Sequence, residues 1–136
     1  MWTHEDSIET SAAPSRVWKF FADVAQWKNW NAGIEAIEIH GPFAPDTTFT
    51  MKPPGQEAFI STLVEVRENE GFVDETVVEG VRVLVNHSLL RRPSGGTRIT
   101  YGTRITGPGA EAFGPMVTSD FPEVLAALKA LAERTE

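Results

Sequence analysis

The chain has 136 residues, a net charge of −7 and no cysteine. This length predicts one domain over residues 1–136, and the lack of cysteine excludes a disulfide framework and a thiol nucleophile. The acidic balance argues against a nucleic-acid partner, and no apolar run reaches the roughly 20 residues that cross a bilayer. The polar start MWTHEDSIET is unlike a signal peptide, so a cytoplasmic location is expected.

The N-terminal third predicts a short strand followed by helix. Residues His4–Thr10 alternate so that His4, Asp6, Ile8 and Thr10 share one strand face. Pro14 suits the first turn of a helix, where its missing N–H has no partner to lose. The apolar side of this helix is expected to be formed by Val17, Trp18, Phe20, Phe21, Val24 and Trp27. A second short helical turn over 27–32 is left open.

From Ile34 the hydrophobic period changes to two. Gly- and Pro-containing turns separate the alternating segments, with no helix between them, which is typical of an antiparallel meander. With the N-terminal segment, about seven strands are predicted. The expected strands after the first are 34–40, 47–52, 57–67, 72–78, 81–91 and 97–106.

The C-terminal segment 119–134 has apolar residues at helical spacing and must cover one face of the sheet. Asp120 and Glu123 resemble a capping box that starts this helix at Phe121, in agreement with Pro122. Because Ala110 to Val117 also has helical spacing, we expect two helical pieces or one helix kinked near Pro122. If aromatic side chains separate helix and sheet, the space between them is a pocket.

His87 and Tyr101 are the most informative polar residues on the predicted sheet. His87 lies between Val85 and Leu89 on one strand face, where it is either a neutral core imidazole or a group that orients a ligand or moves a proton. Tyr101 on the adjacent strand is either a core or a pocket residue. Asp6 is a further candidate for proton transfer. Asp120 has two readings, as a helix cap or as an inward carboxylate.

Sites for metals and nucleotides are not predicted. The three histidines share no metal-ligand spacing. The glycines at 107, 109 and 114 have the wrong spacing for a dinucleotide loop, so no cofactor is expected. No sequence pattern by itself indicates a catalytic set. The residues expected to line an apolar pocket are Trp30, Met51, Ile60, Thr62, Val64, Val83, Val85, His87, Ile99, Tyr101, Phe113, Val117, Phe121 and Leu125.

Several segments resemble the START-like, polyketide cyclase/dehydrase superfamily, also called SRPBCC. The segments that carry the resemblance are Ala13-Pro14-Ser15-Arg16-Val17-Trp18 with Asp23, Trp27 and Trp30, Gly41-Pro42-Phe43 before Thr48-Phe49-Thr50-Met51, Gly95-Gly96-Thr97-Arg98-Ile99-Thr100, Ile105-Thr106-Gly107-Pro108, and Phe113-Gly114-Pro115. The resemblance implies an α+β helix-grip fold, in which a seven-stranded antiparallel sheet wraps around a long C-terminal helix and two small helices follow the first strand. It implies no catalytic motif.

Three functions follow as hypotheses from the pocket and the resemblance. The first is a binding protein for a small, largely hydrophobic molecule that is lipid-, sterol- or polyketide-like. The second is a polyketide cyclase or dehydratase in which His87, Tyr101 or Asp6 moves protons. The third is an interaction domain similar to chaperone activators, with an exposed apolar patch at Trp2 or Trp27. Whether the chain is a monomer or a homodimer is left open.

Overall fold

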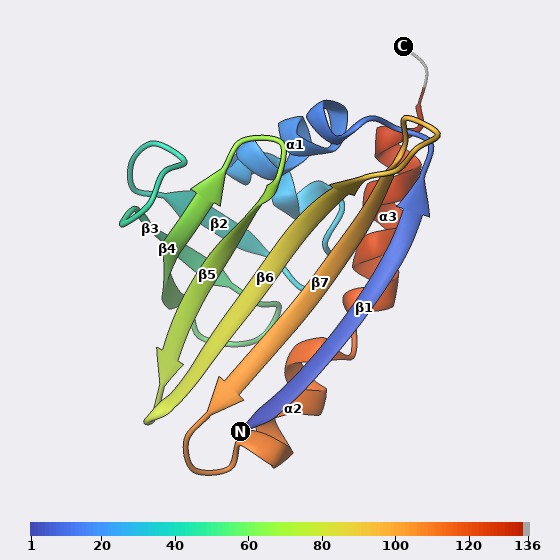
Figure 1. The fold of residues 1–136 in the computed structure, drawn as a ribbon. Helices are drawn as coiled ribbons and strands as arrows, with labels where there is room; N and C mark the ends of the chain where they lie inside the picture. Colours follow the sequence, from blue (N-terminus) through green and yellow to red (C-terminus); the bar gives the residue numbers. More distant parts are fainter. Residues whose placement is uncertain (135–136) are drawn as a thin grey trace.

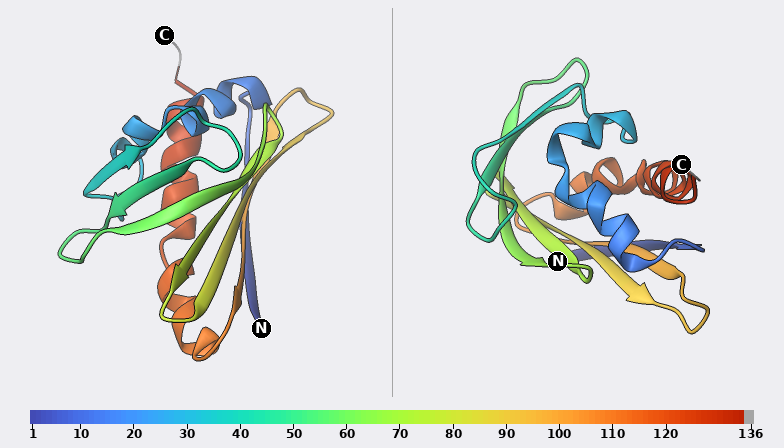
Figure 2. Two further views of the ribbon diagram at one scale, coloured as in Figure 1. Left: turned by 90° about the vertical axis from the view of Figure 1, so that its left-hand side faces the viewer. Right: turned by 90° about the horizontal axis from the view of Figure 1, so that it is seen from above.

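Residues 1–134, which the computed structural model describes, form one curved sheet of seven antiparallel strands with helices on its concave side (Figure 1, Figure 2). The spatial order is β1-β7-β6-β5-β4-β3-β2, so the first strand pairs with the last, and β1 and β2 are the two edges of an open sheet. The strands are β1 (Trp2–Thr10), β2 (Ala36–Ile39), β3 (Thr48–Lys52), β4 (Phe59–Arg67), β5 (Gly71–Val78), β6 (Val81–Arg91) and β7 (Thr97–Thr106). The predicted helix-grip fold is confirmed.

The helices divide as the proline positions predict. After β1 come α1 (Pro14–Ala22) and the 3-10 helix η1 (Val24–Asn29), so the first helix ends earlier than expected and its continuation is a separate turn. At the C-terminal end, α2 (Ala110–Thr118) and α3 (Phe121–Ala132) are two pieces. Pro122 lies in the first turn of α3, where a backbone N–H would have no partner within the helix, so the missing N–H of proline costs nothing. The alternative of two helical pieces is therefore confirmed.

Helix α3 crosses the inner side of the sheet and is tied down at its C-terminal end. The Thr10 hydroxyl on β1 donates a 2.7 Å hydrogen bond to the Glu133 carboxylate. The Arg16 Nε of α1 donates a 2.7 Å hydrogen bond to the Ala132 carbonyl, and Lys129 Nζ donates to the Glu9 carbonyl at 2.7 Å. The apolar face of α3 is buried against the sheet through Phe121, Val124, Leu125, Leu128 and Ala132.

The inner face of the sheet follows from alternation along paired strands, apart from a register shift between Leu63 and Glu65 of β4. On β1 and β7, Asp6 pairs with Tyr101 and Ile8 pairs with Ile99, and the β7 partners are buried. On β6, His87 pairs with Tyr101 on one side and with Phe72 of β5 on the other. Side chains of neighbouring strands at paired positions lie on the same face. The predicted sharing of one face by His87 and Tyr101 is confirmed.

For three predicted pocket residues on strand β4, the structure shows that the prediction is wrong. Ile60 and Val64 are 61% and 46% exposed, and with Thr62 they lie on the outer face, while Ser61 and Leu63 are buried. Along β4, the residues at odd positions and those at even positions both include hydrophobic side chains, so the sequence alone does not indicate which set faces the interior. The choice is made by register, because Ser61 pairs with the buried Phe49 of β3, and a one-residue shift reverses every side chain. Ile60, Thr62 and Val64 therefore do not line the interior.

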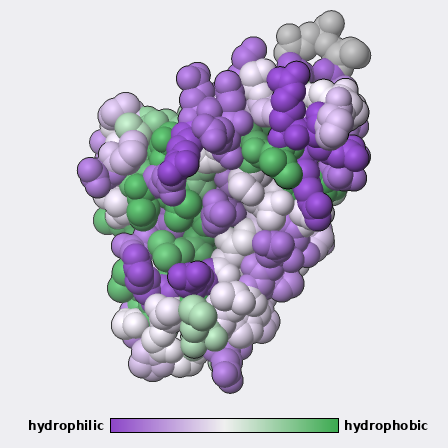
Figure 3. All heavy atoms as spheres, viewed as in Figure 1, coloured by the Kyte–Doolittle hydropathy of each residue, from purple (hydrophilic) through white to green (hydrophobic). Residues whose placement is uncertain are grey.

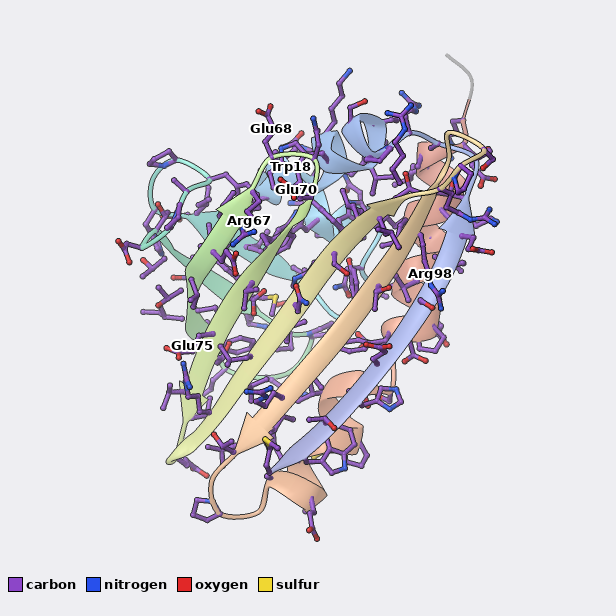
Figure 4. The ribbon with its side chains drawn as sticks, in the orientation of Figure 1. Trp18, Arg67, Glu68, Glu70, Glu75 and Arg98 are labelled. Carbon is purple, nitrogen blue, oxygen red and sulfur yellow. The ribbon has the colours of Figure 1, made fainter. Side chains whose placement is uncertain are left out.

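The outer face of the sheet carries charged and apolar side chains together. Figure 3 shows this face with hydrophobic residues lying among polar ones, and Figure 4 shows Glu75 and Arg98 among the side chains along the strands of this face. Arg82 of β6 forms an ion pair with Glu75 of β5, and the exposed apolar residues Ile60, Val64, Val77 and Leu90 lie on β4, β5 and β6. Within residues 1–134, no helix is long and apolar enough to span a bilayer.

Candidate functional site

The centre of the inner face is occupied by contacting aromatic rings. Phe72 stacks on His87 with 3.9 Å between ring centroids and 9° between planes. Phe21 of α1 contacts Phe72 edge-on at 5.1 Å, and Tyr101 contacts Phe121 of α3 at 5.6 Å. Such edge-to-face and stacked pairs add to the stability gained by burial. In this structure the protein's own rings therefore fill the place where the sequence predicts an open pocket.

A buried polar cluster lies within these rings and consists of Asp74, His87 and Tyr101. The His87 ring contacts the Tyr101 ring at 4.6 Å between centroids, and its Nε2 is 3.9 Å from the Asp74 carboxylate. The His87 Nδ1 lies 3.3 Å from the Phe72 carbonyl and donates to it when that nitrogen carries the proton. All three side chains come from adjacent strands, β5, β6 and β7, at paired or neighbouring positions.

Burial shifts the protonation of all three groups toward their neutral forms. It raises the pKa of Asp74 to about 7 and lowers the pKa of His87 to about 3, although the Phe72 carbonyl acts in the opposite direction on His87. Burial also raises the pKa of Tyr101, with further contributions from the charges of Asp74 and Asp120. Because the charged forms lose hydration, a neutral imidazole faces a carboxyl group that exchanges its proton near neutral pH.

Two members of the cluster lack hydrogen-bond partners. Within residues 1–134, no hydrogen bond from a protein group reaches the Tyr101 hydroxyl or the Asp74 carboxylate, and the 3.9 Å approach of His87 is too long to be one. Buried polar groups are normally satisfied by the protein or by water. Neither atom is fully enclosed, since within residues 1–134 the Trp30 Nε1 is the one enclosed side-chain nitrogen or oxygen without a partner. The hydrogen-bonding capacity of Tyr101 and Asp74 is therefore open to water or to a ligand.

Asp74 is the site residue that the sequence analysis missed. The signal was present, since Phe72, Asp74, Thr76 and Val78 alternate along one strand and Phe72 points to the core. An acidic residue in line with a buried phenylalanine indicates an inward carboxylate. Asp6, the candidate chosen instead, is half-buried on β1, where its carboxylate binds the His4 Nε2 at 2.8 Å.

A hollow of about 290 Å³ lies between the segment that follows η1 and the N-terminal half of α3. Its walls include Trp30 and Gly33 on one side and Asp120 and Val124 on the other. Asp120 directly precedes Phe121, whose ring contacts Tyr101 of the polar cluster at 5.6 Å between centroids, and the charge of Asp120 raises the pKa of Tyr101. The right-hand view of Figure 2 shows the region of η1 facing α3 on the open side of the sheet.

Asp120 does not act as the predicted helix cap. It occupies the position before α3, but its side chain makes no capping hydrogen bond. Instead, one carboxylate oxygen is so near Gly33 that a Cβ atom there would lie 3.0 Å from it. Burial raises the pKa of Asp120, opposed by its own backbone N–H and assisted by Glu123. The second reading of Asp120, as an inward carboxylate, is the one that the structure supports.

A second hollow, of about 480 Å³, lies on the outer face of the sheet. Its lining includes Glu5, Leu84, Asn86, Gly102 and Arg104, and the glycine leaves room between the neighbouring strands. Although it is the wider of the two, it lies on the opposite face from the buried titratable cluster. The candidate site is therefore the inner cluster together with the hollow at Asp120.

The other predicted pocket residues lie in three places. Met51, Val85 and Ile99 are on the inner face and join the main core. Val83, Phe113 and Val117 gather at the α2 end in a smaller cluster with Ile105. Trp30 lines the hollow, and Phe121 and Leu125 belong to the buried side of α3. Trp27 is 6% exposed, so the idea that it forms an exposed patch is wrong.

Comparison with known proteins gives a match at the level of family and fold. Residues 1–133 match a family model described as polyketide cyclase / dehydrase and lipid transport. A comparison with curated protein sequences finds no match.

Among solved structures, a protein from Mesorhizobium loti superposes with a TM-score of 0.81 at 16% identity, covering 99% of both chains. Norcoclaurine synthase from Thalictrum flavum, solved in complex with dopamine and hydroxybenzaldehyde, gives a TM-score of 0.77 at 14% identity, covering 99% of this chain and 89% of that one. Ara h 8.0201 gives 0.75 at 15%, covering 96% and 97%. At these identities the likeness establishes the fold.

Proposed function

The chain belongs to the polyketide cyclase/dehydrase and lipid transport family, and from this membership we propose that it binds a small, largely apolar molecule between the inner face of the sheet and α3. The ligand is lipid-, sterol- or polyketide-like. The fold supports this proposal by analogy, because one fold hosts many functions. The norcoclaurine synthase complex adds the example of a similar fold that holds small aromatic molecules.

The observation that carries the proposal is the unsatisfied polar cluster inside an aromatic surrounding. The Tyr101 hydroxyl and the Asp74 carboxylate have no hydrogen-bond partner among the described protein groups, yet neither is fully enclosed, so both can bond water or a ligand. A ligand with an apolar body and a polar group supplies the missing partners. Sites for small molecules commonly combine apolar walls with a few such polar groups.

The hollow at Asp120 is the proposed entrance to this site. It lies between α3 and the segment that follows η1, and Asp120 in its wall directly precedes Phe121, whose ring contacts Tyr101 of the cluster. The apolar part of the ligand occupies space that the inner rings vacate by changing rotamer. Binding therefore couples to side-chain motion of Phe21 and Phe121, which contact Tyr101.

Native mass spectrometry of freshly purified protein, followed by thermal unfolding with fatty acids, sterols and aromatic polyketides, tests this proposal. A ligand present at 100 times its Kd stabilises the folded state by about 2.7 kcal/mol. Tyr101→Phe is expected to weaken binding, whereas Thr100→Val on the outer side of the same strand leaves it unchanged. No retained molecule and no thermal shift with the whole panel would refute the proposal.

Catalysis by the same cluster is a second candidate, and the pairing of Asp74 with His87 favours it. A carboxyl with a pKa of about 7 next to a neutral imidazole can give or take a proton near neutral pH. This makes a cyclase or dehydratase activity on a polyketide-like substrate the alternative function. His87→Ala is then expected to abolish turnover while binding survives. Equal loss of both, or of neither, argues for a binding protein.

A further inference from the structure

The buried cluster contains two hydrogen-bond acceptors that lie close to each other. The His87 Nδ1 lies 3.3 Å from the Phe72 carbonyl oxygen, which can only accept a hydrogen bond. This contact places the proton of the neutral imidazole on Nδ1, so the His87 Nε2 is left as an acceptor. The Nε2 lies 3.9 Å from a carboxylate oxygen of Asp74. When Asp74 is ionised, a group that bonds both atoms must therefore supply two hydrogen atoms.

Both acceptors can be reached by the same atom. Because they are 3.9 Å apart, one atom can lie at an ordinary hydrogen-bond distance of about 2.9 Å from each of them. Within residues 1–134, neither acceptor has a hydrogen-bond partner, and neither is a fully enclosed atom. The position next to both is therefore open to a group that the described part of the protein does not supply.

The carboxylate of Asp74 also lacks a counter-charge. Among residues 1–134, no lysine or arginine forms an ion pair with Asp74. The arginines of the neighbouring strands β6 and β7 are exposed to solvent, and they are Arg82, Arg91, Arg98 and Arg104. Burial without a positive partner raises the pKa of Asp74 to about 7. A cationic ligand supplies the charge that the protein does not.

We infer that the ligand of the inner site carries a primary or secondary ammonium group, which binds to the Asp74 carboxylate and the His87 Nε2. The inference rests on the proposed function and specifies the polar group of its largely apolar ligand. Such an ammonium group has at least two N–H donors and a positive charge, so it bonds both acceptors and neutralises the carboxylate. The rings of Phe72 and Tyr101, which contact the His87 ring, form apolar walls for the rest of the molecule.

Other polar groups match the two acceptors less well. A hydroxyl group has one hydrogen atom, so it leaves one of the acceptors without a donor. A carboxylate has no donor, and it is repelled by Asp74 and by Asp120, whose charge also acts on Tyr101. A water molecule supplies two hydrogen atoms but no charge. Of these groups, the ammonium group alone provides both donors and the charge.

Three probes with the same naphthyl body test this inference by isothermal titration calorimetry at pH 8: 2-(2-naphthyl)ethylammonium, 2-(2-naphthyl)ethanol and 2-naphthylacetate. The amino group of the first probe, like that of lysine with a pKa of about 10, stays protonated at this pH. We expect the ammonium probe to bind about tenfold more tightly than the other two, because only its hydrogen bond to the carboxylate joins two opposite charges. This comparison uses the wild-type protein, so it does not depend on the folding of a variant.

Acid should weaken the binding of the ammonium probe to the wild type. A carboxyl group with a pKa of about 7 is about nine-tenths ionised at pH 8 and about one-tenth at pH 6, so the affinity should fall about tenfold. His87 and Tyr101 keep one protonation state in this range, because burial lowers the pKa of His87 to about 3 and raises that of Tyr101. Asp120 and the pair of His4 with Asp6 also face the inner side, and the variant without the cluster carboxylate measures their contribution.

A matched pair of variants locates the interaction. Asp74→Asn is expected to weaken the ammonium probe about tenfold at pH 8 and to reduce its pH dependence, while the alcohol probe changes less. Glu75→Gln removes a carboxylate from the next residue, on the outer face (Figure 4), and should leave the affinity for both probes unchanged. His87→Phe keeps a flat ring but removes the Nε2 acceptor. It should weaken the ammonium probe about fivefold, as the loss of one neutral hydrogen bond implies.

The outcomes separate this inference from the proposed function. If the alcohol or the carboxylate probe binds as tightly as the ammonium probe, or if the affinity of the ammonium probe is the same at pH 6 and pH 8, the ammonium assignment is overturned while ligand binding stands. Equal effects of Asp74→Asn and Glu75→Gln on the ammonium probe overturn it in the same way. If none of the three probes binds, the assignment is overturned as well. The proposed function itself fails only if, in addition, the fatty acids, sterols and polyketides produce no binding.

Discussion

The two faces of the sheet differ in whether their polar groups are solvated and paired. On the outer face, Arg82 pairs with Glu75 and Arg92 pairs with Glu9, all in contact with solvent. On the inner face, Asp74 and Tyr101 are buried among rings without hydrogen-bond partners. Outer polar groups keep the protein hydrated at little energetic cost. Inner ones lose most of their hydration without gaining a protein partner, and this points to a functional role.

Removing a ring from the inner face should have the largest effect on stability. Phe21 is fully buried and contacts the rings of Phe72, His87 and Tyr101. Phe21→Ala is expected to lower the free energy of unfolding by about 3–5 kcal/mol, measured by denaturant titration. A loss below about 1 kcal/mol would mean that the inner face is loosely packed, contrary to the contacts described.

Substitutions at two adjacent residues of β4 allow the energetic contributions of the two faces to be compared directly. Leu63 is fully buried and Val64 is 46% exposed. Leu63→Ala should cost about 2–5 kcal/mol of unfolding free energy, whereas Val64→Ala should change it by about 0.5 kcal/mol or less, as is usual on a surface. The same denaturant titration measures both. Equal effects would show that the strand register is different.

The pH dependence of stability reports on the buried cluster. The raised pKa of Asp74, about 7, means that its stabilising contribution is present below pH 3.8 and is lost as the pH rises through 7. The lowered pKa of His87, about 3, means that its contribution is present above pH 6.5 and is lost as the pH falls through 3. Between pH 4 and 6.5 the two slopes have opposite signs and offset each other.

Single substitutions in the cluster should separate the two slopes. In His87→Leu, the free energy of unfolding is expected to fall between pH 4 and 7, by an amount on the order of a few kcal/mol. In Asp74→Asn it should instead rise from pH 4 to 6.5. The free energy of unfolding of the wild type, measured by urea titrations at these pH values, should depend less on pH than that of either variant. The same slope in all three proteins would contradict this account.

The smallest effect is expected on the outer face. Arg82 is more than half exposed where it pairs with Glu75, and exposed ion pairs contribute about 0–1 kcal/mol. Arg82→Gln should therefore change the denaturant midpoint only slightly, and added salt should remove the difference. A large loss that persists in high salt would show that this face is energetically similar to the inner one.

Local chemistry determined the elements and the order in which they occur. The alternation of apolar residues predicted the long strands β6 and β7 with the bounds that the structure has. A strand with one buried face must place its apolar residues at every second position. Pro14 and Pro122 marked helix starts, because proline fits the first helical turn and disrupts later ones. These signals depend on neighbouring residues, so a single sequence contains them.

Tertiary structure decided which residues form the candidate site. The face of β4 depended on pairing with β3, and the interior was filled by rings from several elements, so neither could be read from local spacing. Asp120 has the sequence of a helix cap, yet its carboxylate lies beside Gly33, far away in the chain. Hydrogen bonds that are missing, like those of Trp30 and Tyr101, appear only when all neighbours are in place. The physical reason is that propensity and alternation act within a segment, whereas burial and partner satisfaction depend on contacts between segments.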